Sequence, residues 1–318
     1  MNTVIVNPYK EVQGLNLVTP APASAWIVLD EISYRAGPEF DLVIPKLALR
    51  AGAKTAIVGG NGSGKTTLLK LLLADLQPDA GVITLQGEAA GLFGLAGRQN
   101  LGVQLQETGF NPVYRVRDIF AVNAAARPFV DPEILDLMGI PEIAKRRFGD
   151  LSSGQKQRVQ LALALAHKPQ FAIFDEPTSN LDPVYEEAFV DLLNRLSRGN
   201  LDFTAIYISH TAKLVESCDQ ILILAHGRIE TYASLDEVVT RFYGEKAALF
   251  EGAPDTLSAI AAALPKSATH KTAKGRLRAF GDTLLTQSAL TLAQNHTLER
   301  FSTWNTCAAD ILEDLKND

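Results

Sequence analysis

Three short runs of the chain carry the residue types needed to bind and split a nucleoside triphosphate. Residues 59–66 read GGNGSGKT, residues 151–155 read LSSGQ and residues 171–176 read FAIFDE. In the first run, glycines let successive backbone N–H groups turn toward phosphate oxygens, and a lysine and a hydroxyl suit the outer phosphates and Mg²⁺. The third run predicts a buried strand whose closing carboxylates emerge where the first run opens.

The residues of the first and third runs divide by expected role. Glu176 is the candidate to orient or deprotonate the attacking water, and Asp175 and Thr66 are the candidate Mg²⁺ ligands. An acidic pair can also end a strand as a solvated cap, but a phosphate loop between a strand and a helix favours the catalytic interpretation. The residues expected to hold the nucleotide are Gly59, Asn61, Gly62, Ser63, Gly64, Lys65, Thr66 and Thr67.

Phosphoryl transfer depends on in-line positioning of the attacking water and on charge placed around the γ-phosphate. The first and third runs of a single chain do not supply all the donors that this requires. Ser152 and Gly154 stand where a helix is expected to begin. Since a helix N-terminus can bind an anion, they are candidates for the missing donors.

The pattern of apolar residues predicts the elements that position these runs. Residues 26–34 and 40–49 alternate like strands of a half-buried antiparallel sheet, and residues 54–58 predict a buried strand. A helix is expected over 65–76, directly after the phosphate loop.

The second half of this region predicts helices and further buried strands. Residues 116–148 predict several short helices broken at prolines, and residues 155–166 predict one more. Strands are expected over 171–174 and 205–209, with a helix over 186–196 between them. This alternation indicates an α/β fold with a mostly parallel, covered sheet.

We therefore predict three segments. Residues 1–25 form a tail that ends in a Pro/Ala linker, and residues 26–245 form the main domain with an inserted helical lobe at about 107–165. Residues 246–318 predict a small α+β domain of an order close to βαβαβ, followed by a short helix over 310–315.

Composition excludes several classes of protein. With 318 residues and 47% hydrophobic content the chain can form a sizeable core, and its formal net charge of -6 argues against a main role in neutralising nucleic acid. Two distant cysteines favour neither a zinc site nor a disulfide framework. No apolar run reaches the ~18–20 residues of a membrane-spanning helix, and the start does not read as a secretory signal. One basic cluster is interpreted as a solvated face: Lys266, His270, Lys271, Lys274, Arg276 and Arg278.

The ordered motifs resemble those of the ATP-binding cassette (ABC) family, over roughly 26–243. The family's Walker A loop, signature and Walker B strand match the three runs above. Gln106 is similar to its glutamine-loop residue, residues 179–182 (SNLD) to its aspartate loop, and His210 to its switch histidine. The resemblance implies a P-loop NTPase fold with an antiparallel β-subdomain and a helical lobe.

By that resemblance, two copies close head to tail over two ATP molecules with Mg²⁺. Ser152, Gly154, Gln155 and Asp182 would then meet the nucleotide held by the opposite copy. Gln106 would join the Mg²⁺ ligands, and Gln106, Lys65 and His210 would act with Glu176 in catalysis. A lone histidine or glutamine is more often structural, so these two roles depend on the resemblance.

Two positions depart from the family pattern. Ser153 stands where the signature usually has glycine, which places a side chain near the expected phosphate contact. The aromatic residue that usually stacks on adenine has no clear counterpart, since Ala36 falls near its place. Tyr34 and Phe40 are the substitutes, and both could equally be core side chains.

The resemblance implies an ATPase that drives a separate membrane permease, in the cytoplasm and peripheral to the inner face of the cell membrane. Residues 102–108 and 310–315 are similar to ATPases of ABC-2-type exporters, which predicts export. An importer ATPase with a regulatory C-terminal domain and a soluble non-transport ABC ATPase are the alternatives.

Overall fold

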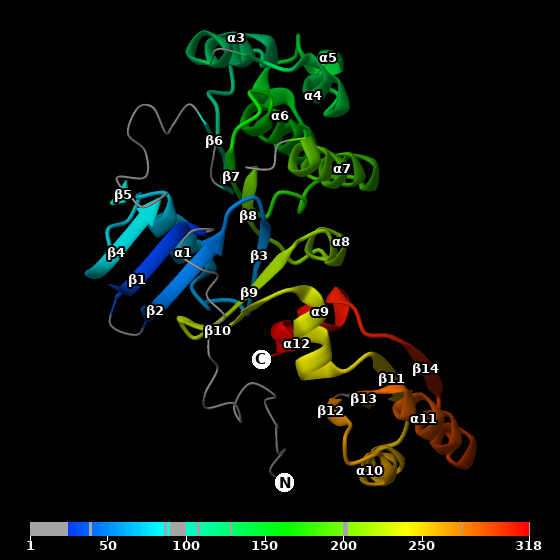
Figure 1. The fold of residues 1–318 in the computed structure, drawn as a ribbon. Coiled ribbons are helices and arrows are strands. Elements are labelled where there is room, and N and C mark those ends of the chain that lie inside the picture. The colour runs from blue at the N-terminus through cyan, green and yellow to red at the C-terminus, as the bar shows by residue number, and fades with distance from the viewer. Residues whose placement is uncertain are drawn as a thin grey trace. The chain divides into compact units, whose positions relative to one another are not determined.

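The computed structural model describes residues 25–37, 40–85, 88–89, 100–106, 109–127, 129–199, 203–273 and 275–317. They form two compact units (Figure 1). The large unit holds the described residues of Leu17–Tyr232 and of Leu312–Asp318, and the small unit holds Ala233–Ile311. The division falls before the boundary expected at 246, and the end of the chain belongs to the large unit. The tail and linker expected over 1–25 lie outside the described residues, apart from residue 25.

A six-stranded sheet forms the centre of the large unit. The pairs β9–β3, β3–β8, β8–β7 and β7–β6 are parallel. Strands β3, β7 and β8 are buried along their whole length. Their largely apolar sequences fit a sheet covered on both faces. The order is β10 (Arg228–Ala233), β9 (Gln220–Ala225), β3 (Lys54–Val58), β8 (Thr204–Ile208), β7 (Phe171–Asp175) and β6 (Leu101–Gln104).

A second, antiparallel sheet packs beside the first. Its order is β2 (Asp41–Arg50), β1 (Ala25–Arg35), β4 (Ala80–Leu85) and β5 (Glu88–Ala89). One core joins its inner face, the leucines of α1 (Lys65–Leu72) and the central strands of the parallel sheet. Helices α7 (Pro183–Gly199) and α8 (Ala212–Glu216) connect strands of the parallel sheet. Phe189 of α7 contacts Phe174 of β7 at a ring-centroid distance of 5.3 Å.

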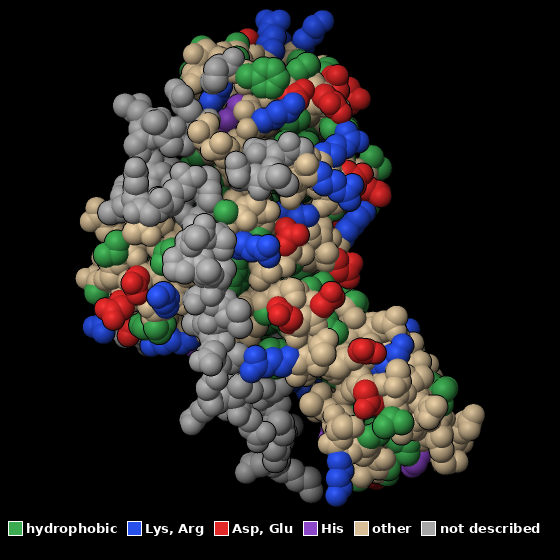
Figure 2. All heavy atoms as spheres, in the orientation of Figure 1, with side chains coloured by type: hydrophobic (Ala, Val, Ile, Leu, Met, Phe, Trp, Pro, Cys, Tyr) green, Lys and Arg blue, Asp and Glu red, His purple; other side chains and the backbone are tan. Residues whose placement is uncertain are grey.

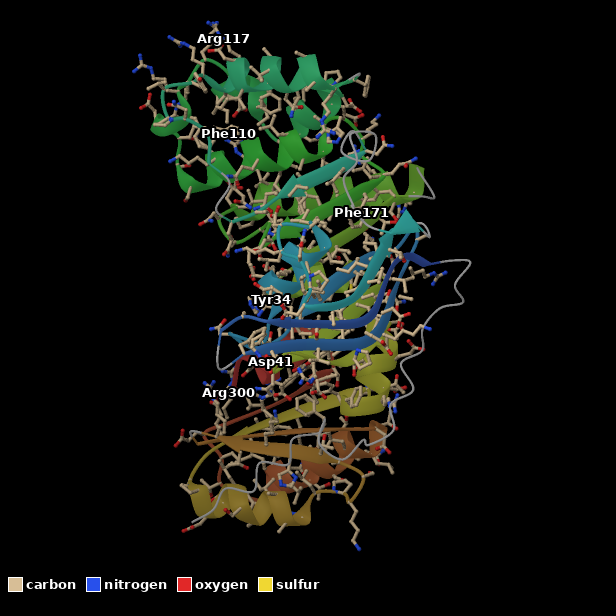
Figure 3. All side chains as sticks on the ribbon, turned by 90° about the vertical axis from the view of Figure 1, so that its left-hand side faces the viewer. Tyr34, Asp41, Phe110, Arg117, Phe171 and Arg300 are labelled. Atoms are coloured by element: carbon tan, nitrogen blue, oxygen red, sulfur yellow. The ribbon has the colours of Figure 1, made fainter. Side chains whose placement is uncertain are left out.

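The predicted helical lobe is present in the large unit. It contains α3 (Val116–Ala126), α4 (Pro132–Leu137), α5 (Ile140–Ile143), the 3₁₀ turn Phe148–Asp150 and α6 (Ser153–Leu165). Proline occupies the first turn of α4 and of α5, where its missing N–H costs no helical hydrogen bond. Figure 3 shows Phe110 inside the lobe, where its ring packs edge-on against Phe148, and Arg117 at the outer edge.

The helix after the phosphate loop is shorter than expected. It ends at Leu72, because Ala74 has a left-handed backbone with φ 55°. The N–H groups of Ala74 and Asp75 donate to the carbonyls of Leu71 and Lys70, which is the pattern of a Schellman motif. Alanine in place of the usual glycine removed the sequence signal for this stop.

The small unit has one strand more than predicted. Its elements are α9 (Leu235–Val238), the π-helical turn Val239–Tyr243, β11 (Lys246–Glu251), α10 (Pro254–Ala263), β12 (Thr269–Ala273), β13 (Arg276–Gly281), α11 (Thr283–Asn295), β14 (Arg300–Asn305) and α12 (Ala308–Asn317). The order is therefore βαββαβ, with the antiparallel sheet β12-β13-β11-β14, and the expected βαβαβ order was wrong. The missed strand, β12, is exposed and polar along most of its length, so it carries no alternating apolar pattern.

Helix α12 contributes to both units. In the small unit, the buried Asp310 accepts hydrogen bonds from the Arg278 guanidinium, the Trp304 ring N–H and the Cys307 backbone N–H. Within the large unit, Leu312 and Leu315 are buried, and a Cβ built at Gly60 would lie 3.3 Å from the Leu315 carbonyl oxygen. Leu315 therefore lies beside the phosphate loop.

Candidate nucleotide-binding site

The phosphate loop joins β3 to α1, as its sequence predicts. Lys65 opens the helix, and its Nζ donates to the carbonyl oxygens of Gly59 and Gly60, at 2.9 Å each. The N-cap residue, Gly64, has φ 104°, and a Cβ there would lie 2.6 Å from the Phe40 ring. A glycine is therefore needed at this position both for the backbone conformation and for the close approach of Phe40.

A cavity of about 600 Å³ opens at the loop and collects residues from several elements. They come from the loop, from α1, from the ends of β7 and β8, and from the chain after β6. The described lining residues are Ala36, Phe40, Asn61, Gly62, Gly64, Lys65, Thr66, Thr67, Gln106, Asp175, Glu176, Ile208 and His210. The six side chains given catalytic or metal-binding roles from the sequence thus surround one space at the carboxyl edge of the sheet. Ile208 is the lining residue that the sequence analysis did not single out.

Charged groups of opposite sign line this cavity: Lys65 is positive, and Asp175 and Glu176 are negative. Lys65 and Asp175 are both buried. Burial lowers the pKa of Lys65, and the negative charges of Glu176 and Asp175 oppose that effect. Burial likewise raises the pKa of Asp175, opposed by Lys65 and Lys70. For both side chains the effect of burial outweighs the attraction between the opposite charges, so the site holds two charged groups at a cost.

Glu176 occupies a strained position directly after β7. Its backbone has φ 51°, which is uncommon for a residue with a side chain. Its N–H donates to the Ile208 carbonyl, and its own carbonyl accepts from the Ser179 hydroxyl at 3.0 Å. In the side chain, Oε1 lies 3.3 Å from His210 Nε2. Strain held by such contacts is typical of functional positions.

The residues present fit a triphosphate and Mg²⁺. Ser63 Oγ is buried and makes no hydrogen bond within the described part of the chain, so it can serve a phosphate oxygen. Thr66 offers a hydroxyl and Asp175 a single carboxylate in the same cavity, with Gln106 at its edge. Mg²⁺ is usually bound by one or two carboxylates together with the phosphates of its substrate, so this donor set is sufficient.

The signature and the aspartate loop lie outside this group of lining residues. Ser152 caps α6 in a capping box with Gln155: the Ser152 hydroxyl accepts from Gln155 N at 3.2 Å, and Gln155 Oε1 accepts from Ser152 N at 3.1 Å. Gly154 lies in the first turn, and Asp182 accepts from Tyr185 N at the start of α7. These four predicted nucleotide contacts are therefore not assembled around the cavity of their own chain.

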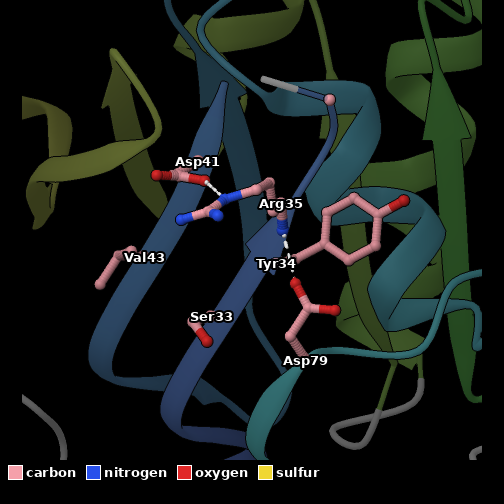
Figure 4. Close-up of a pocket in the computed structure, with 7 residues that line it drawn as sticks. Ser33, Tyr34, Arg35, Asp41, Val43 and Asp79 are labelled. Atoms are coloured by element: carbon pink, nitrogen blue, oxygen red, sulfur yellow. Dashed lines mark hydrogen bonds and ion pairs between the residues drawn. The ribbon is translucent and has the colours of Figure 1, made fainter. Parts of the chain in front are cut away.

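The two candidate aromatic residues are placed differently. Phe40 lines the nucleotide cavity next to Ala36. Tyr34 lines another pocket (Figure 4). In that pocket the Arg35 side chain pairs with Asp41, and the Arg35 backbone N–H donates to Asp79. Both rings also pack against the hydrophobic core.

Comparison with known proteins gives the family. The model of the family described as "ABC transporter" matches residues 44–179. The Nod factor export ATP-binding protein I of a Rhizobium strain is 31% identical over 220 residues, which cover 66% of this chain and 71% of that protein. The chain belongs to the ABC transporter family.

Other ABC transporter proteins are similar over less of their length. The methionine import ATP-binding protein MetN of Caulobacter vibrioides is 32% identical over 218 residues, and the molybdenum import ATP-binding protein ModC of Rhizobium etli is 31% identical over 225. The matches cover 65% and 63% of these two relatives. Among solved structures, an ATP binding subunit of an ABC transporter aligns with a TM-score of 0.60 at 21% identity, over 68% of this chain and 93% of that chain. The fold of an ABC ATPase, predicted from the motifs, is confirmed.

Proposed function

We propose that this chain is an ATP-hydrolysing subunit that pairs with a second copy, or with another ABC subunit, around two ATP molecules. The observation that carries the proposal is the single cavity shared by Lys65, Asp175, Glu176 and His210, with the signature held elsewhere on the same chain. A chain whose signature residues lie outside its own cavity is suited to head-to-tail pairing, in which each signature completes the partner's site.

Each side chain has a defined task in this proposal. Lys65 neutralises charge on the outer phosphates, and Mg²⁺ held by Thr66, Asp175 and Gln106 would neutralise charge on the same oxygens. Glu176 orients the attacking water and accepts its proton, and His210 holds the Glu176 carboxylate from 3.3 Å.

Phe40 is proposed as the aromatic contact for adenine. It lines the nucleotide cavity and lies against Gly64 of the phosphate loop, whereas Tyr34 belongs to a different pocket. Replacement of Phe40 by leucine is expected to weaken ATP binding several-fold, since an aromatic stack adds about 0.5–1.5 kcal/mol to its buried area. Calorimetric titration with ATP would measure this, with Tyr34→Leu as the matched control.

The experiment on hydrolysis compares two substitutions in the cavity. Glu176→Gln should retain ATP binding and lower steady-state turnover by roughly 10²–10⁴-fold, the range of a general base. Lys65→Ala should lose ATP binding. Turnover of Glu176→Gln near that of the native chain, measured by phosphate release, would contradict the role of Glu176.

We also propose that the work done is transport through a separate permease, at the inner face of the cell membrane, with export as the direction. The names of MetN, ModC and the Nod factor protein support transport, and the last of these supports export. Import is the second candidate, because the names of MetN and ModC describe import. The permease in this proposal is a separate polypeptide, as the names of the relatives as ATP-binding proteins suggest. Among the described residues, no helix is long and apolar enough to span a bilayer. Purification from detergent-solubilised membranes should recover a multispanning protein, and the direction of cargo movement in proteoliposomes decides between export and import.

Nucleic acid is not a proposed partner. On the face shown in Figure 2, Lys and Arg side chains are interspersed with Asp and Glu side chains. Arg195 and Glu133, for example, pair at 2.9 Å on the exposed surface of the large unit. Nucleic-acid binding draws instead on clustered basic side chains.

A further inference from the structure

Helix α6, which begins in the LSSGQ run, contacts the segment after Glu176 at three successive points. At the first, a Cβ at Gly154 would lie 2.6 Å from the Asn180 carbonyl oxygen, so the helix start and the aspartate loop touch. At the second, the buried Gln157 donates from Nε2 to the Pro177 carbonyl at 2.8 Å and to the Glu176 carbonyl at 3.4 Å. The backbone that carries Glu176 is therefore held by the signature helix of the same chain.

The third contact is a stack between a cation and an aromatic ring. The guanidinium carbon of Arg158 lies 3.9 Å from the centroid of the Tyr185 ring, and Arg158 is only 6% exposed. Its Nη1 is buried and makes no hydrogen bond to the described residues. The planar face of Arg158 is thus used for stacking on Tyr185, since an arginine this deeply buried needs a compensating partner.

The surroundings leave little room for this pair to move. Gly139, at the turn between α4 and α5, approaches so closely that a Cβ there would lie 2.4 Å from both Arg158 Nη1 and the Tyr185 hydroxyl. Tyr185 in turn lies in the first turn of α7, where its N–H donates to Asp182 Oδ1 at 3.2 Å. The residue whose ring Arg158 contacts therefore also binds the Asp182 side chain, through its backbone N–H, at the end of the aspartate loop.

We propose that Arg158 and Tyr185 are positioning residues that, through their stack, hold the aspartate loop and the Glu176 backbone in a fixed relation to the signature helix. The inference rests on the proposed function, in which the signature meets the ATP held by the partner. Engagement of Ser152 by that ATP is then transmitted through α6 to Glu176 of the same chain. The two ATP sites of the pair are coupled by this route.

A double-mutant cycle tests the stack. Arg158→Met and Tyr185→Leu remove the cation and the ring while keeping much of their volume, and each should lower kcat about tenfold while the KM for ATP changes less than about twofold. The Hill coefficient for ATP should fall in both. If the two side chains act as one unit, the double variant should be no slower than either single variant.

Conservative variants separate positioning from folding. Tyr185→Phe keeps the ring and should keep kcat, whereas Arg158→Lys keeps the charge but loses the planar face and should behave like Arg158→Met. Asp191→Asn, on an exposed position of α7, is the matched control and should behave like the native chain. Melting temperatures of all variants show whether a loss of kcat goes with a loss of folded protein; a full loss of kcat explained by unfolding would overturn the proposal.

The outcomes distinguish this inference from the proposed function. A native chain without ATPase activity would refute the proposed function itself. An active native chain together with normal kcat and cooperativity in Tyr185→Leu, losses that multiply in the double variant, or normal kcat in Arg158→Lys would overturn the coupling through the stack.

Discussion

At the scale of single residues, the site keeps its charges at a cost to stability. Asp175 is only 4% exposed, and burial raises the pKa of its carboxyl. The folded protein thus binds this proton more strongly than the unfolded chain does, so the contribution of Asp175 to stability is lost as pH rises through the raised pKa. A carboxylate kept under these conditions is explained by function, since active sites commonly give up stability for chemistry.

Replacement of this carboxylate should therefore stabilise the protein without nucleotide. Asp175→Asn is expected to melt at a higher temperature than the native chain at pH 7, because no buried carboxylate must stay ionised. The difference should shrink as pH falls through the Asp175 pKa, where the native side chain is also neutral. Melting curves over a pH series would measure this, and an Asn variant that melts lower at pH 7 would contradict the role of burial. The same variant should lose Mg²⁺-dependent hydrolysis.

Among the elements, α6 has at its N-terminus a serine with two roles: Ser152 caps the helix and is the proposed contact for the partner's ATP. The Ser152 hydroxyl accepts from Gln155 N and so caps the helix, and in the proposed pair it also faces the partner's ATP. A helix N-terminus without a capping side chain exposes unsatisfied N–H groups. Stability and pairing should therefore respond differently to different substitutions here.

Two substitutions of Ser152 separate these roles. Ser152→Ala should lower the free energy of unfolding by about 1 kcal/mol, the usual cost of losing an N-cap. Ser152→Asp also caps a helix and should keep that stability, but its charge repels a phosphate and should abolish ATP-driven pairing. Denaturant titration and light scattering provide the two readouts, and normal pairing in Ser152→Asp would count against the signature contact.

The sequence predicts those elements whose patterns are complete within a few residues. The strand over 54–58 was located to the residue, because its apolar end runs directly into the glycine-rich loop. Helix α7 begins at Pro183, before the expected start at residue 186. The prediction missed this start because a proline at the first position of a helix resembles loop composition in the sequence. The β9–β10 hairpin was not predicted, as its turn has His226 where asparagine or aspartate usually signals two residues of positive φ.

For the site, local motifs predict which residues gather at the carboxyl edge of the sheet, and contacts between distant elements escape them. Lys65 and Asp175 each follow from a motif next to a strand. The stack of Arg158 on Tyr185 depends on how α6 packs against α7, and nothing in either local sequence reports that packing. The choice of Phe40 over Tyr34 as the cavity's aromatic side chain likewise required the structure.

At the level of the whole molecule, the last described turns of α12 belong to the same unit as the phosphate loop. Leu315, which belongs to the large unit, is 5% exposed, and its carbonyl oxygen would lie 3.3 Å from a Cβ built at Gly60. Leu315→Ala should therefore lower the stability of the large unit by about 2–5 kcal/mol, as for other buried leucines. Leu284→Ala, at a 59% exposed position, is the control and should change stability little. Equal melting temperatures for the two variants would show that Leu315 does not stabilise the large unit.

In the proposed pair, ATP is enclosed between two copies of the composite site. The most direct measurement is the molar mass in solution of the Glu176→Gln variant, by light scattering with and without ATP and Mg²⁺. We expect a single-chain mass without nucleotide, twice that mass with ATP, and no such change when Lys65→Ala is added. A Glu176→Gln protein that binds ATP fully and still keeps the single-chain mass would contradict it.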